Sequence, residues 1–595
     1  MAPLWGYKMN LKLSSLPYFQ RWFVVGAIIG VFAGLGSLAF FFAIRLFEII
    51  FFTHIVGMSI PHPLGEGGSA VYHFYALRYY LIPIVVATGG LITGFIVYTF
   101  DPSSEGHGTD AAIRAFHYNH GKIKRRTPLV KTIASAITIG SGGSAGREGP
   151  TALIAAGIGS FLADILGLSP KDRRIAVAVG IGAGIGTIFK APIGGSILGA
   201  EILYRRDFES EVIFPSLVAS SIGYSIFASV VGFEPIFGYY LAPFNVLRLP
   251  FYAVLGLVAG LLSILYIRTF YGVKNMFKKF HIPNHYKPMI GGAIVGIIAL
   301  MFPEILGTGY GWVEILELGK FNELVTFGVP ILIILILLPF VKIIVTSFTV
   351  SSGGSGGVFA PGIFIGASLG AFFGVLFHMV SPTIVPVVAP FVIIGMLSFF
   401  GAAGKAPLAV ILMVVEMTGS LQLLPGAMLA VSIAYIASGT KYSIYESQVE
   451  QRRDSPANMG EYHTPMLLEM KVSSLKIIDN VYADLYYTIY RADNIMKEND
   501  LLSLPVVYHE KLMGAVYLYD IVNQSYGYVK DYYKSGISYV KLDNSAENAW
   551  ELMMKNRTKW CAVVDNGKFM GIITLESILD KYEENVKIIN MGDSN

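Results

Sequence analysis

A long series of apolar segments, broken by glycine and proline, fills residues 22–440 and limits what this chain can fold into. The first segment, 22–50, is long enough to cross a bilayer with some tilt, because about 20 helical residues span the hydrocarbon core. Several later ones, such as 129–139 and 408–417, are too short to cross. Non-helical backbone at membrane depth must line a cavity or be buried in protein. We therefore expect an α-helical polytopic membrane protein with discontinuous helices.

The composition agrees with this class. The 595 residues are 54% hydrophobic and only 14% charged, whereas an ordinary globular protein carries about 25% charged residues. A net charge of +4 without a basic arm gives no sign of a nucleic-acid partner. Cys561 is the single cysteine, so an intramolecular disulfide and a cysteine metal cluster are excluded, and we expect no metal site. The loop 122–126 is basic, so we expect it to lie on the cytoplasmic side of the membrane.

A glycine-rich loop at residues 140–150 opens the apolar run 151–166. Glycine permits close approach to the backbone, and Pro150 fits the first turn of a helix. The free N–H groups and the dipole at a helix N-terminus favour an anion. Glu148 lies inside this loop, so its carboxylate is expected to compete with the anion for the site.

This loop has a counterpart in the second half of the chain. A shift of 211 residues places Ser141-Gly142-Gly143-Ser144 on Ser352-Gly353-Gly354-Ser355. A shift of 215 places Lys190-Ala191-Pro192 on Lys405-Ala406-Pro407, and Glu201 on Glu416. Two such elements in corresponding halves, about 20–235 and 245–450, are typical of a repeat transporter.

The chain becomes polar after residue 440, and we place a domain boundary at residue 453, giving domains 1–453 and 454–595. The second domain contains two similar units, at about 464–527 and 534–590. Each has a short apolar strand, a turn, another strand and a helix, and a helix precedes each pair of strands. This pattern predicts a repeated β-α-β-β-α unit, and hence a soluble α/β pair.

Three motifs in this order resemble the CLC chloride channels and proton/chloride exchangers. They are Gly-Arg-Glu-Gly-Pro at 146–150, Gly-Val-Phe-Ala-Pro at 357–361 and Ile-Tyr-Glu-Ser at 444–447. The tail resembles a pair of CBS domains, which many members of that family carry on the cytoplasmic side. The resemblance implies a multi-pass cell-membrane protein, a homodimer with one anion pathway per subunit, and inverted repeats within each subunit. It implies transport rather than enzymatic catalysis, with chloride and protons as substrates and no required cofactor.

The resemblance also implies roles for residues of this chain. Backbone N–H groups from both loops would line the anion sites, Tyr445 would donate its hydroxyl to the central anion, and Glu148 would be the gate, open when protonated. The implied anion-binding residues are His107, Arg147, Gly149, Val358, Phe359, Ala360 and Tyr445.

Two positions depart from the family pattern. His107 stands where the family often has a serine whose hydroxyl contacts the anion; an imidazole N–H also donates, but it is larger and changes charge near neutral pH. Ile202 stands where exchangers often have a proton-carrying glutamate, and Glu201 is one position earlier. A carboxylate within a membrane is a functional candidate by default, whereas the repeat relation of Glu201 to Glu416 favours a structural cap equally.

The tail keeps half of each motif that family nucleotide sites use. The first unit has Asp520 but Tyr517 in place of Ser/Thr, and the second has Thr574 but Ser577 in place of Asp. ATP or another adenine nucleotide is therefore a candidate regulatory ligand, and a dimerising role is the alternative.

The sequence thus favours proton-coupled chloride antiport gated by Glu148. A passive chloride channel is the alternative within the family. A membrane-anchored nucleotide-sensing protein without transport is the alternative from another class.

Overall fold

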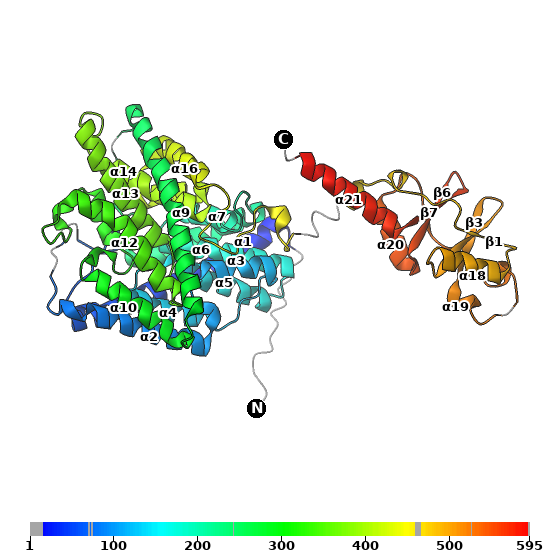
Figure 1. Ribbon diagram of the computed structural model, residues 1–595, viewed down its shortest axis with the longest axis horizontal. Coiled ribbons are helices and arrows are strands. Elements are labelled where there is room, and N and C mark those ends of the chain that lie inside the picture. Colours follow the sequence, from blue (N-terminus) through cyan, green and yellow to red (C-terminus); the bar gives the residue numbers. More distant parts are fainter. Residues whose placement is uncertain are drawn as a thin grey trace. The chain divides into compact units, whose positions relative to one another are not determined.

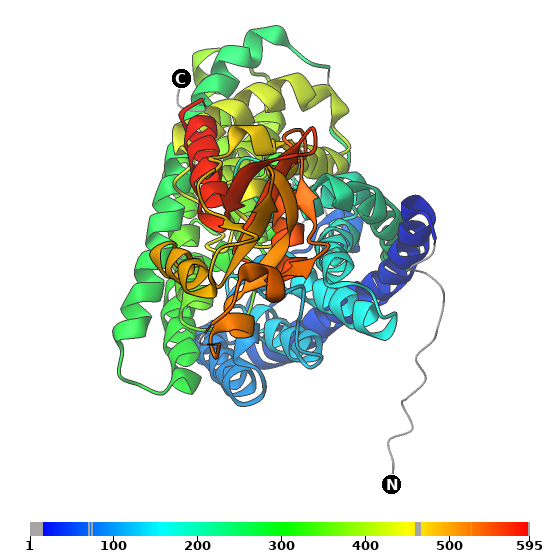
Figure 2. The same cartoon turned by 90° about the vertical axis from the view of Figure 1, so that its right-hand side faces the viewer.

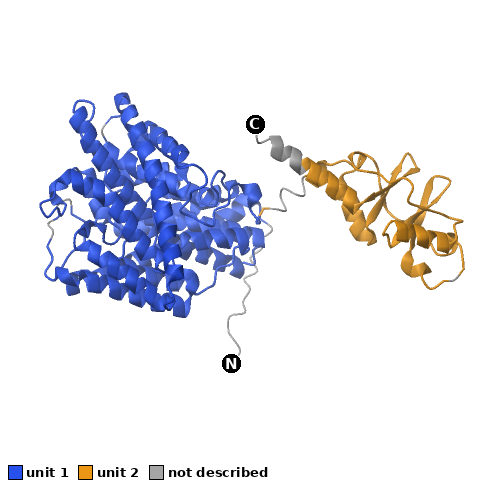
Figure 3. Cartoon of the chain, in the orientation of Figure 1, with its two compact units in different colours: residues 1–457 blue, residues 458–595 orange. Residues whose placement is uncertain are grey.

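The computed structural model describes residues 16–592 except 70, 71, 73, 74, 242, 459–465 and 525, with side chains to residue 585. The chain divides into two compact units, Met1–Ala457 and Asn458–Asn595 (Figure 3). The first unit is helical, and the strands belong to the second (Figure 1).

In the first unit the described residues form two runs of eight α-helices. The first run is α1 (Tyr18–Glu48), α2 (Ile82–Phe100), α3 (Thr109–Tyr118), α4 (Thr127–Gly140), α5 (Glu148–Ile165), α6 (Pro170–Ile188), α7 (Pro192–Glu201) and α8 (Ser210–Val231). The second run is α9 (Leu249–Lys279), α10 (Lys287–Ala299), α11 (Tyr310–Glu317), α12 (Ile331–Ser351), α13 (Phe359–Val380), α14 (Ala389–Gly404), α15 (Pro407–Thr418) and α16 (Leu424–Ser438).

The expectation of a polytopic membrane protein is confirmed. Within the described residues, seven helical stretches are long and apolar enough to cross a bilayer. They are Tyr18–Val56, Tyr79–Phe100, Ser210–Val231, Val246–Lys279, Ile331–Ser351, Phe359–Val380 and Leu421–Ser438. Other helices are far too short to cross, since α3 and α7 have 10 residues each and α11 has 8. These short helices are the discontinuous elements that the uneven apolar segments predict.

The two halves pack in the same way. Helix α1 packs on α8 as α9 packs on α16, and α5 packs on α6 as α13 packs on α14. Small residues allow these contacts: a Cβ on Gly30 of α1 would lie 2.4 Å from the Ala219 oxygen of α8, and one on Gly256 of α9 would lie 2.4 Å from the Ala430 oxygen of α16. Close backbone approach at small residues is how helices associate where lipid removes the hydrophobic driving force.

The two glycine-rich loops meet at the centre of the first unit. The Gly146 nitrogen donates to the Gly357 oxygen at 2.7 Å, and the Gly357 nitrogen donates to the Gly146 oxygen at 2.6 Å. Such an antiparallel, reciprocal pair is what a two-fold relation between the halves produces. It brings the N-terminus of α5 next to that of α13.

The second unit contains two copies of one motif. The first is β1 (Ala483–Asp484), α18 (Ile489–Glu498), β2 (Ser503–Tyr508), β3 (Lys511–Tyr517) and α19 (Leu518–Ile521), with β4 (Lys534–Ser535) added at the edge. The second is β5 (Tyr539–Val540), α20 (Ala546–Asn556), β6 (Trp560–Asp565), β7 (Lys568–Thr574) and α21 (Leu575–Gly592). Figure 2 gives a second view of these strands, coloured orange to red.

The copies match in register as well as in order. In each copy a parallel pair precedes an antiparallel hairpin, and the hairpin carries a bulge, at Val506/Val507 in the first and Val563/Val564 in the second. Asn566 and Gly567 have φ of 48° and 79°, as a two-residue hairpin turn of the Asn-Gly type requires. The predicted β-α-β-β-α repeat is confirmed.

Candidate functional site

Glu148 is the first residue of α5 and is fully buried where the loops meet. One carboxylate oxygen accepts a hydrogen bond from the Tyr310 hydroxyl. The other accepts from the backbone nitrogen of Ala360, at the start of α13, at 3.2 Å. The carboxylate therefore occupies the place among helix N-termini that the sequence suggests for an anion.

Glycine is required beside this carboxylate. A Cβ on Gly146 would lie 2.0 Å from the Glu148 Oε2 atom, and a Cβ on Gly149 would lie 2.0 Å from the His107 oxygen. The loop thus packs backbone against backbone, and Gly149 brings α5 against the His107 loop.

The Arg147 side chain points into an ion pair and not toward Glu148. Its guanidinium donates two hydrogen bonds to the Glu66 carboxylate, one of them at 3.0 Å, and both residues are buried. The same guanidinium lies 5.1 Å from the Tyr310 ring centroid. A bidentate pair of this kind fixes orientation. The guanidinium is thus held by Glu66, and the backbone N–H of Arg147 lies at the start of α5 beside Glu148.

His107 and Tyr445 lie side by side on the other side of the loops. Their ring centroids are 5.4 Å apart, and both residues are buried. His107 also lines a cavity of about 390 Å³, together with Gly106, Asp110 and Phe270. The structure thus gathers His107, Tyr445, Gly149 and Ala360, which lie up to 338 residues apart in the sequence.

The remaining predicted anion-site residues belong to the start of α13. Val358 is buried and its carbonyl accepts a hydrogen bond from the Tyr266 hydroxyl at 3.3 Å. The Phe359 ring packs on Phe400 and Phe189, with centroids 4.1 and 4.7 Å away. These contacts fix the helix end whose N–H groups face Glu148.

Glu201 of α7 caps the start of α15, and Glu416 of α15 caps the start of α7. The two oxygens of Glu201 accept from the backbone nitrogens of Leu408 and Ala409, at 3.2 and 2.8 Å, at the start of α15. The two oxygens of Glu416 accept from Ile193 and Gly194, at 3.1 and 2.8 Å, at the start of α7. Negative groups stabilise helix N-termini, so this geometry accounts for both carboxylates as caps.

Ile202 follows Glu201 directly and is fully buried. Its carbonyl accepts a hydrogen bond from the Gln448 side chain at 2.9 Å, three residues after Tyr445. Its aliphatic side chain has no ionisable proton.

Sequence reasoning missed Tyr310, although a signal for it exists. Gly307-Thr308-Gly309 before Tyr310 matches Gly106-His107-Gly108 in the first half. These loops match at a shift of 201, and the shift of 211 relates two buried lysines that hold them. Lys131 donates to the Gly106 oxygen at 2.7 Å, and Lys342 donates to the Ile305 oxygen at 2.7 Å.

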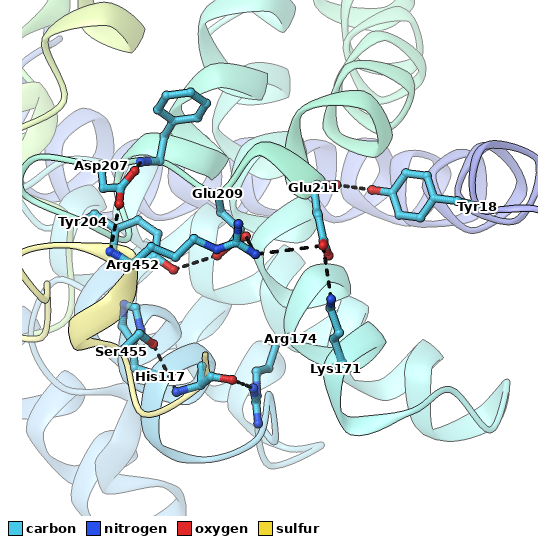
Figure 4. A network of polar contacts seen from close by, with 12 residues as sticks. Tyr18, His117, Lys171, Arg174, Tyr204, Asp207, Glu209, Glu211, Arg452 and Ser455 are labelled. Atoms are coloured by element: carbon cyan, nitrogen blue, oxygen red, sulfur yellow. Dashed lines mark hydrogen bonds and ion pairs between the residues drawn. The ribbon is translucent and has the colours of Figure 1, made fainter. Parts of the chain in front are cut away.

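The segment after Tyr445 is anchored to the first unit by a polar network (Figure 4). The Arg452 backbone nitrogen donates to the Asp207 carboxylate at 3.0 Å, and its guanidinium lies 3.0 Å from the buried carboxylate of Glu209. The Ser455 hydroxyl lies 2.7 Å from the His117 Nδ1 atom. The segment 444–457, which follows the central site, is therefore fixed to the rest of the first unit.

The candidate nucleotide residues of the tail have partners of their own. Asp520 forms an ion pair with Lys534 at 2.9 Å, and hydrogen bonding to Tyr519 and Asp520 raises the pKa of Lys534 to about 12. The Thr574 nitrogen donates to the Ser577 hydroxyl at 3.0 Å, capping α21. A nucleotide at either position would have to replace these contacts.

Comparison with known proteins finds a family match within each unit. The family described as "Voltage gated chloride channel" matches residues 89–439, and "CBS domain" matches residues 529–584. "Uncharacterized protein MJ0305" of Methanocaldococcus jannaschii is 33% identical over 288 residues, which are 48% of this chain and 69% of that protein. "Voltage-gated ClC-type chloride channel ClcB" of Salmonella typhimurium is 29% identical over 439 residues, covering 71% of this chain and 96% of the relative.

A solved structure has the same fold. The slow cyanobacterial Cl⁻/H⁺ antiporter aligns with a TM-score of 0.60 and 23% identity, over 72% of this chain and 96% of its own.

Proposed function

The chain belongs to the voltage-gated chloride channel family, and on that premise we propose that it exchanges chloride for protons across a membrane, with Glu148 as the gate. The observation that carries the proposal is the position of the Glu148 carboxylate, which accepts hydrogen bonds from Tyr310 and from the first turn of α13. The N–H groups at the start of α13 also suit chloride.

The gate follows from electrostatics. An ionised carboxylate gains free energy from helix N-termini and N–H donors, as chloride does, so the two compete for one place. Protonation of Glu148 removes most of that gain and releases the donors to chloride. One group thus binds a proton and excludes an anion, which links the two movements.

The inner part of the pathway contains Tyr445 and His107. In our proposal the Tyr445 hydroxyl and an imidazole N–H of His107 donate to a dehydrated chloride between Glu148 and the cavity. Their adjacent rings and their burial support this assignment.

Protons on the inner side require a route without a glutamate at position 202. Both Glu201 oxygens accept helix N–H groups, and Ile202 carries no proton. We propose that water in the cavity beside His107 supplies the proton instead. The missing carboxylate at this position also favours the second candidate, a passive chloride channel.

We further propose that the protein acts as a homodimer in the cell membrane, with its CBS pair in the cytoplasm and an adenine nucleotide as regulatory ligand. The basic residues of the loop 122–126 support the cytoplasmic side.

Liposomes with purified protein distinguish the candidates. An imposed proton gradient should drive chloride against its own gradient if the protein is an exchanger. Downhill chloride flux without such accumulation would indicate the channel. No chloride flux at all would leave the nucleotide-sensing alternative.

A further inference from the structure

The cavity beside His107 extends to a second wall that the chloride pathway does not use. This wall contains Lys278 near the end of α9, Asn284, and Lys287 at the start of α10. The cavity also contacts Asn119, next to the basic loop 122–126, so it opens on the side that we expect in the cytoplasm.

The charges on the cavity lining are unequally satisfied. Of its two carboxylates, Asp110 accepts from the Ser447 nitrogen at 2.8 Å, and Glu105 accepts from the Tyr98 hydroxyl at 2.7 Å. Among its cations, Lys274 pairs with Glu446 at 2.8 Å.

Lys287 is the unexplained member of this lining. It is only 9% exposed, and its side chain forms no hydrogen bond or ion pair in the part of the chain that the structure describes. A largely buried lysine that lines a cavity and has no carboxylate partner favours an anion in that cavity. Lys278, near the end of the preceding helix α9, also forms no ion pair among the described residues.

The backbone adds to the positive charge. Lys287 is the first residue of α10, a helix of 13 residues, so the positive end of the helix dipole lies at the same wall. Pro288 follows it and has no N–H to leave unsatisfied. A dipole end and two ammonium groups favour an anion with several acceptor oxygens, for which lysine is a common point-charge partner.

The cavity has room for a ligand larger than a monatomic ion. About 390 Å³ lies in the range of small-molecule pockets, roughly 300–1,000 Å³. We propose that the wall formed by Lys278, Asn284 and Lys287 binds a phosphate-type oxyanion, separately from chloride at His107 and Tyr445. This inference goes beyond the proposed exchange, because it holds whether or not protons are coupled. Since the oxyanion would share the cavity with incoming chloride, its binding should lower chloride flux.

The test is equilibrium binding of radiolabelled inorganic phosphate to the purified full-length protein in chloride-free buffer. We expect saturable binding of one phosphate per chain. K287Q should weaken it about tenfold or more, the effect of losing one hydrogen bond to a charge. K287R keeps the charge and should retain binding. K279Q changes an exposed lysine of the same helix end that does not line the cavity, and should leave binding unchanged.

A second measurement identifies the source of the phosphate group and checks the fold. Phosphatidic acid in mixed micelles should displace the labelled phosphate only if a lipid headgroup also enters this wall. In liposomes without phosphate, K287Q should carry chloride like the parent protein, which shows that its fold and pathway are intact. K278Q provides a second variant if K287Q does not fold. No saturable phosphate binding, or equal affinity in K278Q, K287Q and K279Q, would overturn the proposal.

Discussion

Replacing Tyr310 with Phe should open the pathway. The Glu148 carboxylate accepts hydrogen bonds from two groups, the Tyr310 hydroxyl and the Ala360 nitrogen, the latter at 3.2 Å. The Tyr310 ring packs against Phe237, with centroids 5.6 Å apart, and beneath the Arg147 guanidinium. Phe keeps this packing and removes only the hydroxyl.

The expected magnitude follows from one lost hydrogen bond to a charged group, about 1.5–3 kcal/mol. This loss applies to the closed gate, so the ratio of open to closed gate should rise roughly 10- to 150-fold. Other steps will limit the observed gain in flux. The flux of Tyr310→Phe at pH 7 should approach its flux at pH 5, because opening of the gate depends less on protonation of Glu148 when the Tyr310 hydroxyl is absent.

Initial rates of chloride efflux from proteoliposomes at pH 5 and pH 7 measure both effects. Tyr72→Phe is a matched control, since Tyr72 donates to the Ser59 oxygen and its ring packs edge-on against Trp312 of α11, without touching Glu148. Equal flux at pH 7 in Tyr310→Phe and the parent protein would refute the claim that the Tyr310 hydroxyl stabilises the closed gate. The same change in Tyr310→Phe and Tyr72→Phe would refute it as well.

Four further outcomes are expected. Glu66→Gln should lower the thermal midpoint in detergent, because it leaves the buried Arg147 charge unpaired at a cost of about 3–5 kcal/mol, and Glu450→Gln at a half-exposed position should not. Burial raises the pKa of the Cys561 thiol to about 12, so the single cysteine should resist a thiolate-specific reagent at pH 8 until urea unfolds the tail. Because the unfolded thiol ionises first, at about pH 9, the stability of the tail relative to Cys561→Ser should fall as pH rises from about 9 to 12. Millimolar ATP should raise the thermal midpoint of the tail and Asp520→Ala should reduce the shift; no shift with ATP, ADP or AMP would favour a purely structural tail.

Backbone requirements made the centre of the site predictable from sequence. The loops around Glu148 need glycine for close approach and proline at a helix start, and these residues stand out in an apolar chain. Their repetition at a shift of 211 then predicted the second half. The reciprocal bonds between Gly146 and Gly357 are the physical reason that both copies carry the pattern.

Side-chain partners distant in sequence were not predictable. The Gly-Thr-Gly pattern before Tyr310 marks its loop, but no pattern marks its partner Glu148, 162 residues away. Glu66 pairs with Arg147 across 81 residues, and no local pattern marks it. For Glu201 the sequence left carrier and cap equally open, because both roles need a buried carboxylate. The two N–H donors of α15 account for Glu201 as a cap, and its role as a proton carrier stays a prediction.

The reversal potential under opposed chloride and proton gradients tests the central proposal most directly. If Glu148 couples the two ions, the potential at zero current will depend on both gradients in the parent protein, and on chloride alone in Glu148→Gln, which should still conduct. A parent potential that equals the chloride equilibrium potential at every pH gradient would contradict proton coupling and leave a passive chloride channel.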